Sequence, residues 1–197
     1  MRNFIVVCFI LFFSGCVIAE DEQIAKIFTK YGVNGTIIIS SLDNKHVFIH
    51  NDVRANTKFS PASTFKIPNT LIALEEDVIL GKDDSIKWDG TLYSYPNWNH
   101  DHTLASAFNV SCVWCFQKLA KRVGVDKYHQ YLAAINYGEL QNPFEVTTFW
   151  LDNSLKISPT EQIDFLRKLY QRTLPFNAHS YDTLREIMQV EAASNFK

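Results

Sequence analysis

Ser63 and Lys66, three positions apart in an apolar stretch, constrain the fold of this chain more than any other feature. Residues at this spacing share one face of a helix, so the hydroxyl and the amine can meet within one turn. Apolar neighbours such as Phe65 would bury that turn, and burial lowers the pKa of a lysine because it disfavours the ammonium ion. The spacing is therefore compatible with a nucleophile beside a base, although alone it more often marks a helix-capping serine followed by a solvated lysine.

The composition favours one well-packed domain or two intimately packed subdomains. Of the 197 residues, 47% are hydrophobic and 14% are aromatic, which is enough to bury a substantial core. The net charge is −2 and the basic residues are scattered, so we expect no nucleic-acid or polyanion partner.

Residues 1–19 have the pattern of a secretory signal peptide. Arg2 precedes the apolar run 4–13, and small residues at the end of the segment suit cleavage after Ala19. The apolar run is too short to cross a bilayer as a helix. We therefore expect a mature domain over residues 20–197 that is exported to the bacterial periplasm.

The four cysteines fall into two pairs. Cys8 and Cys16 lie in the leader, and the residues before Cys16 are similar to a bacterial lipoprotein box, so a lipid anchor at Cys16 is the alternative to soluble export. Cys112 and Cys115 lie in the mature chain, where export permits a disulfide. Their position within an apolar helical pattern favours two small buried thiols over a disulfide or a redox site.

Periodicity and turn signals predict two strands near the start of the mature chain, followed by helices. The stretch 82–102 is rich in Asp, Asn, Trp and Tyr and is typical of an irregular loop. The expected regular segments are antiparallel strands within residues 35–50 and helices over 63–80, 103–123, 126–135 and 181–190, with a further helix begun by the capping box of Ser158 and Glu161.

Three further motifs are ambiguous when each is taken alone. Ser111 is a second candidate for moving a proton, but a helical serine more often bonds a backbone carbonyl. Tyr137 and Gly138 form a turn signal, and Trp150 with Leu151 is more typical of an aromatic core.

The order and spacing of all these motifs resemble the class D, or oxacillinase-type, serine beta-lactamases. The resemblance extends from about Gly35 to Asn195 and implies an α+β fold, in which a helical subdomain packs on an antiparallel sheet as in penicillin-binding transpeptidases. The motifs that carry it are Pro61-Ala62-Ser63-Thr64-Phe65-Lys66, Trp98 with Asp101 and Thr103-Leu104, Ser111-Cys112-Val113-Trp114, and Trp150-Leu151 through Ile157-Ser158.

The resemblance implies a role for each catalytic residue. Ser63 would be the acylated nucleophile, and Lys66 would carry an N6-carboxylated side chain that acts as general base. Ser111 would pass a proton to the lactam nitrogen, and Val113 would keep the pocket dry. Carbon dioxide or bicarbonate would supply the carboxyl group, with no metal and no other cofactor.

The remaining site residues are also implied by the resemblance. Trp150 would donate its indole N–H to the carboxylated lysine, while Leu151, Tyr137 and Gly138 would lie at the pocket. The substrates would be penicillin-type beta-lactams, so the protein would confer antibiotic resistance. Whether the protein forms a homodimer stays an open question at this point.

The sequence departs from the family pattern at two places. Glu139 stands where the family has an asparagine after Tyr-Gly, and we expect altered loop packing there rather than lost chemistry. The family also has a Lys-Thr-Gly or Lys-Ser-Gly strand after the last helix, whereas this chain stops at Lys197. We therefore expect the sequence to be C-terminally incomplete, without the strand that supplies one oxyanion donor.

Two alternatives use the same motifs. A beta-lactam-sensing domain would be acylated without turnover, although apolar Val113 argues against it. An inactive remnant is the other alternative.

Overall fold

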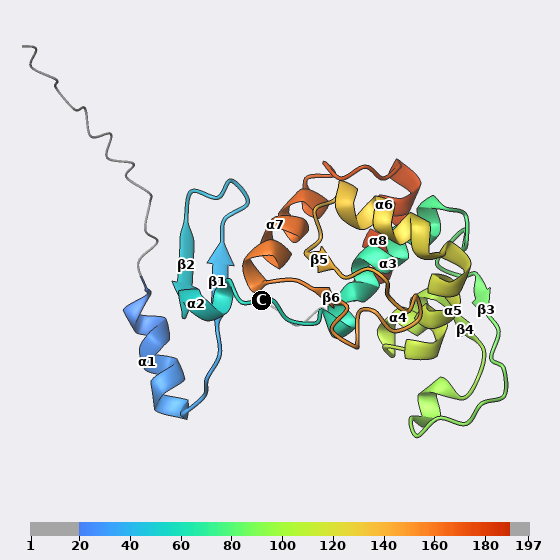
Figure 1. Ribbon diagram of the computed structural model, residues 1–197, viewed down its shortest axis with the longest axis horizontal. Helices are drawn as coiled ribbons and strands as arrows, with labels where there is room; N and C mark the ends of the chain where they lie inside the picture. Colours follow the sequence, from blue (N-terminus) through green and yellow to red (C-terminus); the bar gives the residue numbers. More distant parts are fainter. Residues whose placement is uncertain (1–19, 190–197) are drawn as a thin grey trace, which may run out of the picture. The chain divides into compact units, whose positions relative to one another are not determined.

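The computed structural model describes residues 20–189 (Figure 1). The backbone divides into two compact units, Met1–Asp52 and Val53–Lys197, and each is described by itself. The predicted signal peptide, residues 1–19, lies outside the described residues, as does the lipid alternative at Cys16. Across the described part of the chain, no helix is both long and apolar enough to cross a membrane.

The described part of the first unit contains one helix and one hairpin. Helix α1 (Glu22–Tyr31) starts at Asp21, whose carboxylate accepts hydrogen bonds from two backbone N–H groups of the first turn. The sequence reading did not identify this helix. Strands β1 (Ile37–Ser40) and β2 (Val47–His50) pair antiparallel, which confirms the two strands predicted in this region.

The second unit is mostly helical, with short strands between the helices (Figure 1). From the boundary helix onward, its elements in chain order are α2 (Asp52–Ala55), η1 (Ala62–Phe65), α3 (Lys66–Glu75), β3 (Ser85–Ile86), η2 (Pro96–Trp98), β4 (His102–Thr103), α4 (Leu104–Asn109), α5 (Val113–Val123), α6 (Val125–Ala134), β5 (Glu139–Leu140), β6 (Leu155–Lys156), α7 (Pro159–Tyr170) and α8 (Ala178–Met188).

Helix α3 is the central helix of this unit. It packs against both α5 and α8 (Figure 1), and every residue from Pro68 to Leu74 is buried. A helix buried on all sides must satisfy its polar side chains internally. Asn69 does so in part, because its side-chain oxygen accepts a 2.7 Å hydrogen bond from the hydroxyl of Tyr128. Because α3 is packed between other helices, Lys66 at its N-terminus has a fixed position.

The predicted helix over residues 63–80 is wrong at its C-terminal end. Helix α3 stops at Glu75, and Asp77 follows with a φ of 51°, in the left-handed region. The backbone N–H of Val78 then donates to the carbonyl oxygen of Ala73 at 2.9 Å, which closes the helix end. The apolar residues beyond it line the core from a turn rather than from a helix.

Side-chain caps set the starts of α7 and α8. Ser158 and Glu161 form the capping box that the sequence predicts, with proline in the first turn of α7. Helix α8 begins earlier than expected because the Asn177 side chain accepts a hydrogen bond from the backbone N–H of Ser180.

The antiparallel pair of β5 and β6 depends on Gly138, which immediately precedes β5. Gly138 has a φ of 66°, a conformation that L side chains rarely adopt. A Cβ at this position would also collide with the carbonyl oxygen of Lys156 and the side chain of Ile157. Glycine therefore allows the two backbones to approach each other.

We predict that Gly138→Ala lowers the free energy of unfolding by about 2 kcal/mol or more, because it adds both backbone strain and a steric collision. Gly90→Ala is the matched control, since Gly90 also has a positive φ (86°) but has open space around it. Urea unfolding of both variants measures the difference. Equal losses for the two variants would show that the close approach at Gly138 carries no cost.

Candidate active site

The Ser63 hydroxyl is carried by the short turn η1, which runs directly into α3. The backbone N–H of Lys66 donates to the carbonyl oxygens of Ser63 and Thr64, so Ser63 and Lys66 lie one turn apart, as their spacing predicts. Ser63 is exposed, whereas the neighbouring Phe65 is buried. The turn thus presents a hydroxyl to solvent at the N-terminal end of α3, where the helix dipole favours negative charge.

The side chain of Lys66 is half-buried and is held by two oxygen atoms. Its Nζ donates a 2.6 Å hydrogen bond to Ser111 Oγ and a 2.7 Å hydrogen bond to the backbone carbonyl of Phe108. The same nitrogen lies 4.7 Å from the centre of the Phe108 ring. Burial lowers the pKa of Lys66, because the enclosed ammonium ion loses hydration. A larger share of neutral amine, the form that can accept a proton, results near neutral pH.

The single helix predicted over residues 103–123 is wrong, because the structure has two helices there, α4 and α5. The interruption between them lets Ser111 reach Lys66. The helical conformation is interrupted between α4 and α5, and Ser111 lies in this break with a φ of 52°. The carbonyl oxygen of Val110 accepts a 3.0 Å hydrogen bond from the Trp98 indole, in place of the helical partner that the break removes. The interruption therefore positions a catalytic candidate and is stabilised by a side chain from the preceding loop.

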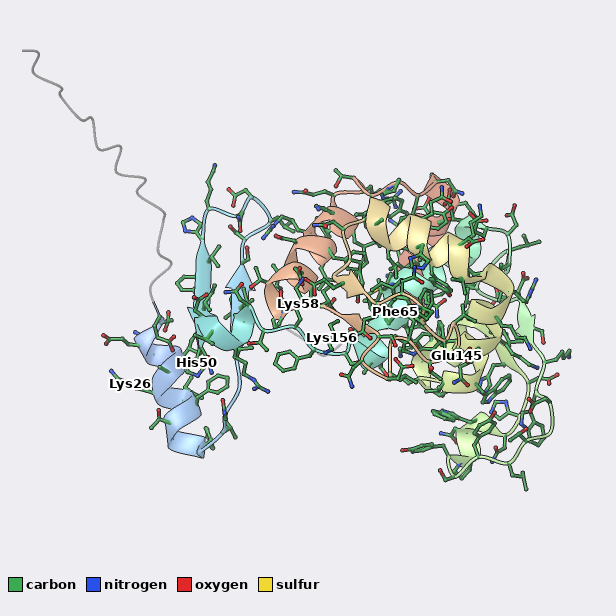
Figure 2. All side chains as sticks on the ribbon, viewed as in Figure 1. Lys26, His50, Lys58, Phe65, Glu145 and Lys156 are labelled. Atoms are coloured by element: carbon green, nitrogen blue, oxygen red, sulfur yellow. A yellow bond between two sulfur atoms is a disulfide. The ribbon has the colours of Figure 1, made fainter. Side chains whose placement is uncertain are left out.

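An aromatic cluster lies behind the Ser63 turn and is centred on Phe65, which Figure 2 labels within the dense side-chain packing of this unit. The Phe65 ring stacks on Trp150 with centroids 5.5 Å apart. The rings of Phe149, Tyr137 and Tyr128 lie 5.0, 5.9 and 6.1 Å from the same ring. All five rings are buried, so they form a rigid apolar support for the turn that carries Ser63 and Lys66.

Trp150 is tied to the Ser63 turn through its backbone as well as its ring. The carbonyl oxygen of Trp150 accepts 3.0 Å hydrogen bonds from the backbone N–H of Ala62 and from the hydroxyl of Ser60. Ala62 has a φ of 47°, an uncommon conformation that this bond helps to hold. Trp150 is therefore a core residue that also holds the Ser63 turn, and its predicted hydrogen bond to a carboxylated Lys66 stays a prediction.

Tyr137 is 1% exposed and is linked to the same turn through Gln162. The Gln162 side chain donates to the Tyr137 hydroxyl at 3.1 Å and to Thr64 Oγ1 at 2.9 Å. Burial raises the pKa of Tyr137 to about 12, because the phenolate would lose hydration. Tyr137 thus stays neutral and acts as a packing and hydrogen-bonding group.

The other predicted pocket residues are placed less directly. Val113 is the first residue of α5 and is half-buried, while Leu151 is 40% exposed beside Trp150. Gly138 belongs to the hairpin described above. Their contribution to a binding pocket stays a prediction.

Glu139, the residue that departs from the family pattern, is the first residue of β5. Its carboxylate accepts a 2.7 Å hydrogen bond from Lys58 Nζ, and the same amine lies 2.9 Å from a carboxylate oxygen of Glu161. The extra negative charge is therefore paired with a lysine outside the Lys66–Ser111 cluster. The expected effect of Glu139 on loop packing stays a prediction.

The interpretation of Cys112 and Cys115 as two buried thiols is wrong, because the structure joins them in a disulfide. Cys112 is the N-cap of α5, with an extended backbone, and Cys115 is in the first turn. Their Cα atoms are 5.4 Å apart, within the range that a disulfide can bridge. The disulfide therefore links the N-cap of α5, which directly follows Ser111, to the first turn of that helix.

Sequence reasoning missed three residues that organise this site. Phe108 supplies both a carbonyl acceptor and a ring to Lys66. Gln162 bridges two motifs, and Trp98 stabilises the break before Ser111. Trp98 alone had a sequence signal, since it belongs to the motifs of the resemblance, whereas the contacts of Phe108 and Gln162 depend on the tertiary fold.

Comparisons with known proteins agree with these motifs. A model of the penicillin binding protein transpeptidase domain matches residues 34–196. The chain is 38% identical to Beta-lactamase OXA-48 of Klebsiella pneumoniae over 177 residues, which are 90% of this chain and 67% of that relative. It is 36% identical to Beta-lactamase OXA-20 of Pseudomonas aeruginosa, over 88% of this chain and 66% of the relative.

A regulatory protein is also similar to this chain. Regulatory protein BlaR1 of Bacillus licheniformis is 36% identical over 176 residues, which are 89% of this chain and 29% of that protein. The chain thus spans about two thirds of the beta-lactamases that it matches and less than a third of BlaR1.

Solved structures confirm the α+β fold class. The class D beta-lactamase FUS-1 (OXA-85) of Fusobacterium nucleatum subsp. polymorphum aligns with a TM-score of 0.84 at 36% identity, covering 88% of this chain and 72% of the other. A class D beta-lactamase from Sebaldella termitidis aligns with a TM-score of 0.83 at 37% identity, covering 87% and 69%.

We predict that Lys66 titrates below the value of about 10.4 that is usual for lysine. At a pH between the lowered pKa of Lys66 in the folded chain and its usual pKa in the unfolded chain, the unfolded chain holds the proton and the folded chain does not. The free energy of unfolding therefore rises with pH in that window. NMR titration of labelled lysine side chains measures this, with Lys66→Met assigning the resonance. A Lys66 pKa at or above the usual value would contradict burial as the dominant influence.

Proposed function

Because this chain belongs to the class D beta-lactamases within the penicillin-binding transpeptidase domain family, we propose that it opens the ring of penicillin-type beta-lactams through an acyl-enzyme on Ser63. The observation that carries the proposal is the partly desolvated amine of Lys66, which donates a hydrogen bond to Ser111. Lys66 itself lies one helical turn from the exposed residue Ser63. Hydrolysis of such antibiotics would confer resistance on the bacterium that makes the protein.

Acylation needs a group that accepts the proton of Ser63 as its oxygen attacks the lactam carbonyl carbon. Lys66 is suited to this task, because burial favours its neutral form and its side chain starts from the same helical turn. A new C–O bond forms to Ser63, and the oxyanion develops near the N-terminus of α3. Lys66 then holds this proton next to the hydroxyl of Ser111.

Ring opening needs a proton at the lactam nitrogen when its bond to the carbonyl carbon breaks. Ser111 Oγ accepts a hydrogen bond from Lys66 at 2.6 Å, so a proton taken by Lys66 can pass to this hydroxyl while the hydroxyl proton goes to the leaving nitrogen. We assign Ser111 this relay. The left-handed conformation at Ser111 is the local cost of that placement.

Lys66 also fits the carboxylation that the resemblance implies. A neutral amine can add carbon dioxide, and the product is an anionic carbamate that supplies a stronger general base for acylation and for deacylation by water. By the resemblance, the indole N–H of Trp150, whose ring stacks on Phe65, would donate to such a group. Val113 and the Phe108 ring would limit the access of water.

We also propose that the protein is exported to the periplasm with residues 1–19 as its leader. Export brings the enzyme to the compartment that beta-lactams enter and permits the disulfide between Cys112 and Cys115. A lipid on Cys16 is the alternative form of export.

A sensing function is the second candidate, and the similarity to BlaR1 favours it. A sensor would form the same acyl bond on Ser63 but would not hydrolyse it. The persistence of the adduct separates the two functions.

We predict that benzylpenicillin adds one penicilloyl group to the protein and that Ser63→Ala abolishes this adduct. Thr64→Ala is the matched control, because it removes the adjacent hydroxyl, which accepts a bond from Gln162. Intact-mass spectrometry in bicarbonate buffer measures the adduct over time. Decay of the adduct supports a hydrolase and persistence a sensor, whereas labelling of the Ser63→Ala variant would disprove the assignment of the nucleophile.

We predict that Trp150→Phe keeps acylation but slows deacylation by at least about tenfold, because it removes the indole donor and retains a ring to stack on Phe65. Phe149→Leu is the control for packing alone, since its side chain carries no donor. Rapid-quench mass spectrometry measures both steps. An unchanged deacylation rate in Trp150→Phe would show that the indole N–H does not support the base.

A further inference from the structure

Three side chains that can bind a metal meet directly after Ser111. A ring nitrogen of His102 and the sulfur atoms of Cys112 and Cys115 all lie within 4.8 Å of one another, and all three residues are buried. None of them has a role in the chemistry proposed above. The two cysteines form a disulfide in this structure, so the cluster has a second chemical state when that bond is reduced.

One ring nitrogen of His102 is hydrogen-bonded, and the other lacks a well-formed hydrogen bond. It is 2% exposed, and its Nδ1 lies 3.0 Å from Ser106 Oγ, a hydroxyl fixed by the capping box of α4. Its Nε2 is buried and makes no hydrogen bond of standard geometry within residues 20–189, although the ring also interacts with the backbone of Asn97. A buried nitrogen left unpaired is destabilising, and coordination of an ion would offset that cost.

The arrangement matches a thiolate–imidazole metal site. Cys112 and Cys115 have the Cys-x2-Cys spacing of zinc sites and lie at the N-terminus of α5, where the helix favours thiolates. Metal-bound histidines usually bond a second group through their other ring nitrogen, as His102 does with Ser106. We propose that the reduced protein binds one Zn²⁺ through His102, Cys112 and Cys115.

The conversion balances with a dithiol as reductant. The dithiol gives two electrons to the disulfide and closes to its own disulfide, and its two protons pass to Cys112 and Cys115. Zn²⁺ then displaces these two protons and accepts a lone pair from neutral His102. Two thiolates neutralise the charge of the ion, which suits a buried site, and a water molecule completes four ligands.

Binding of the ion requires the two sulfur atoms to move apart. Zn–S bonds of about 2.3 Å place tetrahedral sulfur ligands about 3.8 Å apart, so the sulfurs must separate after the disulfide breaks. The Cα atoms of Cys112 and Cys115 are 5.4 Å apart at the start of α5, so this separation requires rotation about the Cα–Cβ bonds of both side chains. Either the disulfide or the ion would then hold the start of α5, next to Ser111.

The test uses the full chain, reduced with a dithiol and freed of it without oxygen, and titrated with Zn²⁺ against a chromogenic chelator. We expect one equivalent to bind the reduced protein and none to bind this site in the oxidised protein. Co²⁺ as a probe should give the thiolate charge-transfer bands of a tetrahedral site. Tight binding by the oxidised protein, or no binding by the reduced protein, would overturn the proposal.

Variants assign the ligands. We expect Cys112→Ser to abolish tight binding and His102→Ala to weaken it by more than about tenfold. The double variant Cys8→Ser/Cys16→Ser is the matched control, because it removes the other two thiols and should bind as the parent does. Loss of binding in this control, or parental affinity in His102→Ala, would refute the site.

A measurement on the parent protein avoids variants that fail to fold. Bound Zn²⁺ should slow alkylation of Cys112 and Cys115, as mapped by mass spectrometry of their peptide. Equal alkylation rates with and without Zn²⁺ would contradict coordination by these thiols.

Discussion

The hydrogen bond between Lys66 Nζ and Ser111 Oγ is the interaction on which the candidate site depends. It joins a residue at the start of the central helix α3 to the break between α4 and α5. Since the amine is partly desolvated, its pKa falls, and a side chain that would otherwise stay charged becomes able to accept a proton. The proposed chemistry follows from placing this amine one turn from Ser63.

The surrounding structure keeps that interaction in place from both sides. On one side, the rings packed around Phe65 and the backbone bonds of Trp150 hold the Ser63 turn. On the other side, the Trp98 indole and the disulfide of Cys112 hold the break that contains Ser111. The uncommon backbone conformations at Ala62 and Ser111 persist because their neighbours are fixed by these contacts.

The sequence predicted what local patterns determine. The helical turn of Ser63 and Lys66 and the capping box at Ser158 depend on residues close in the chain, and both are confirmed. The break near Ser111 was missed because apolar periodicity continues through it, and only the tertiary bond from Trp98 shows where the helix ends. The disulfide was missed for a similar reason, since spacing alone cannot separate two buried thiols from a bonded pair.

The rate of benzylpenicillin hydrolysis by Lys66→Ala, compared with that of the parent protein in bicarbonate buffer, measures how far turnover depends on the Lys66 amine. We expect turnover to be abolished in Lys66→Ala while circular dichroism shows a folded protein, because the substitution removes the amine that is assigned to accept the proton of Ser63. Hydrolysis by Lys66→Ala at the parental rate would contradict the assignment of Lys66 as the base.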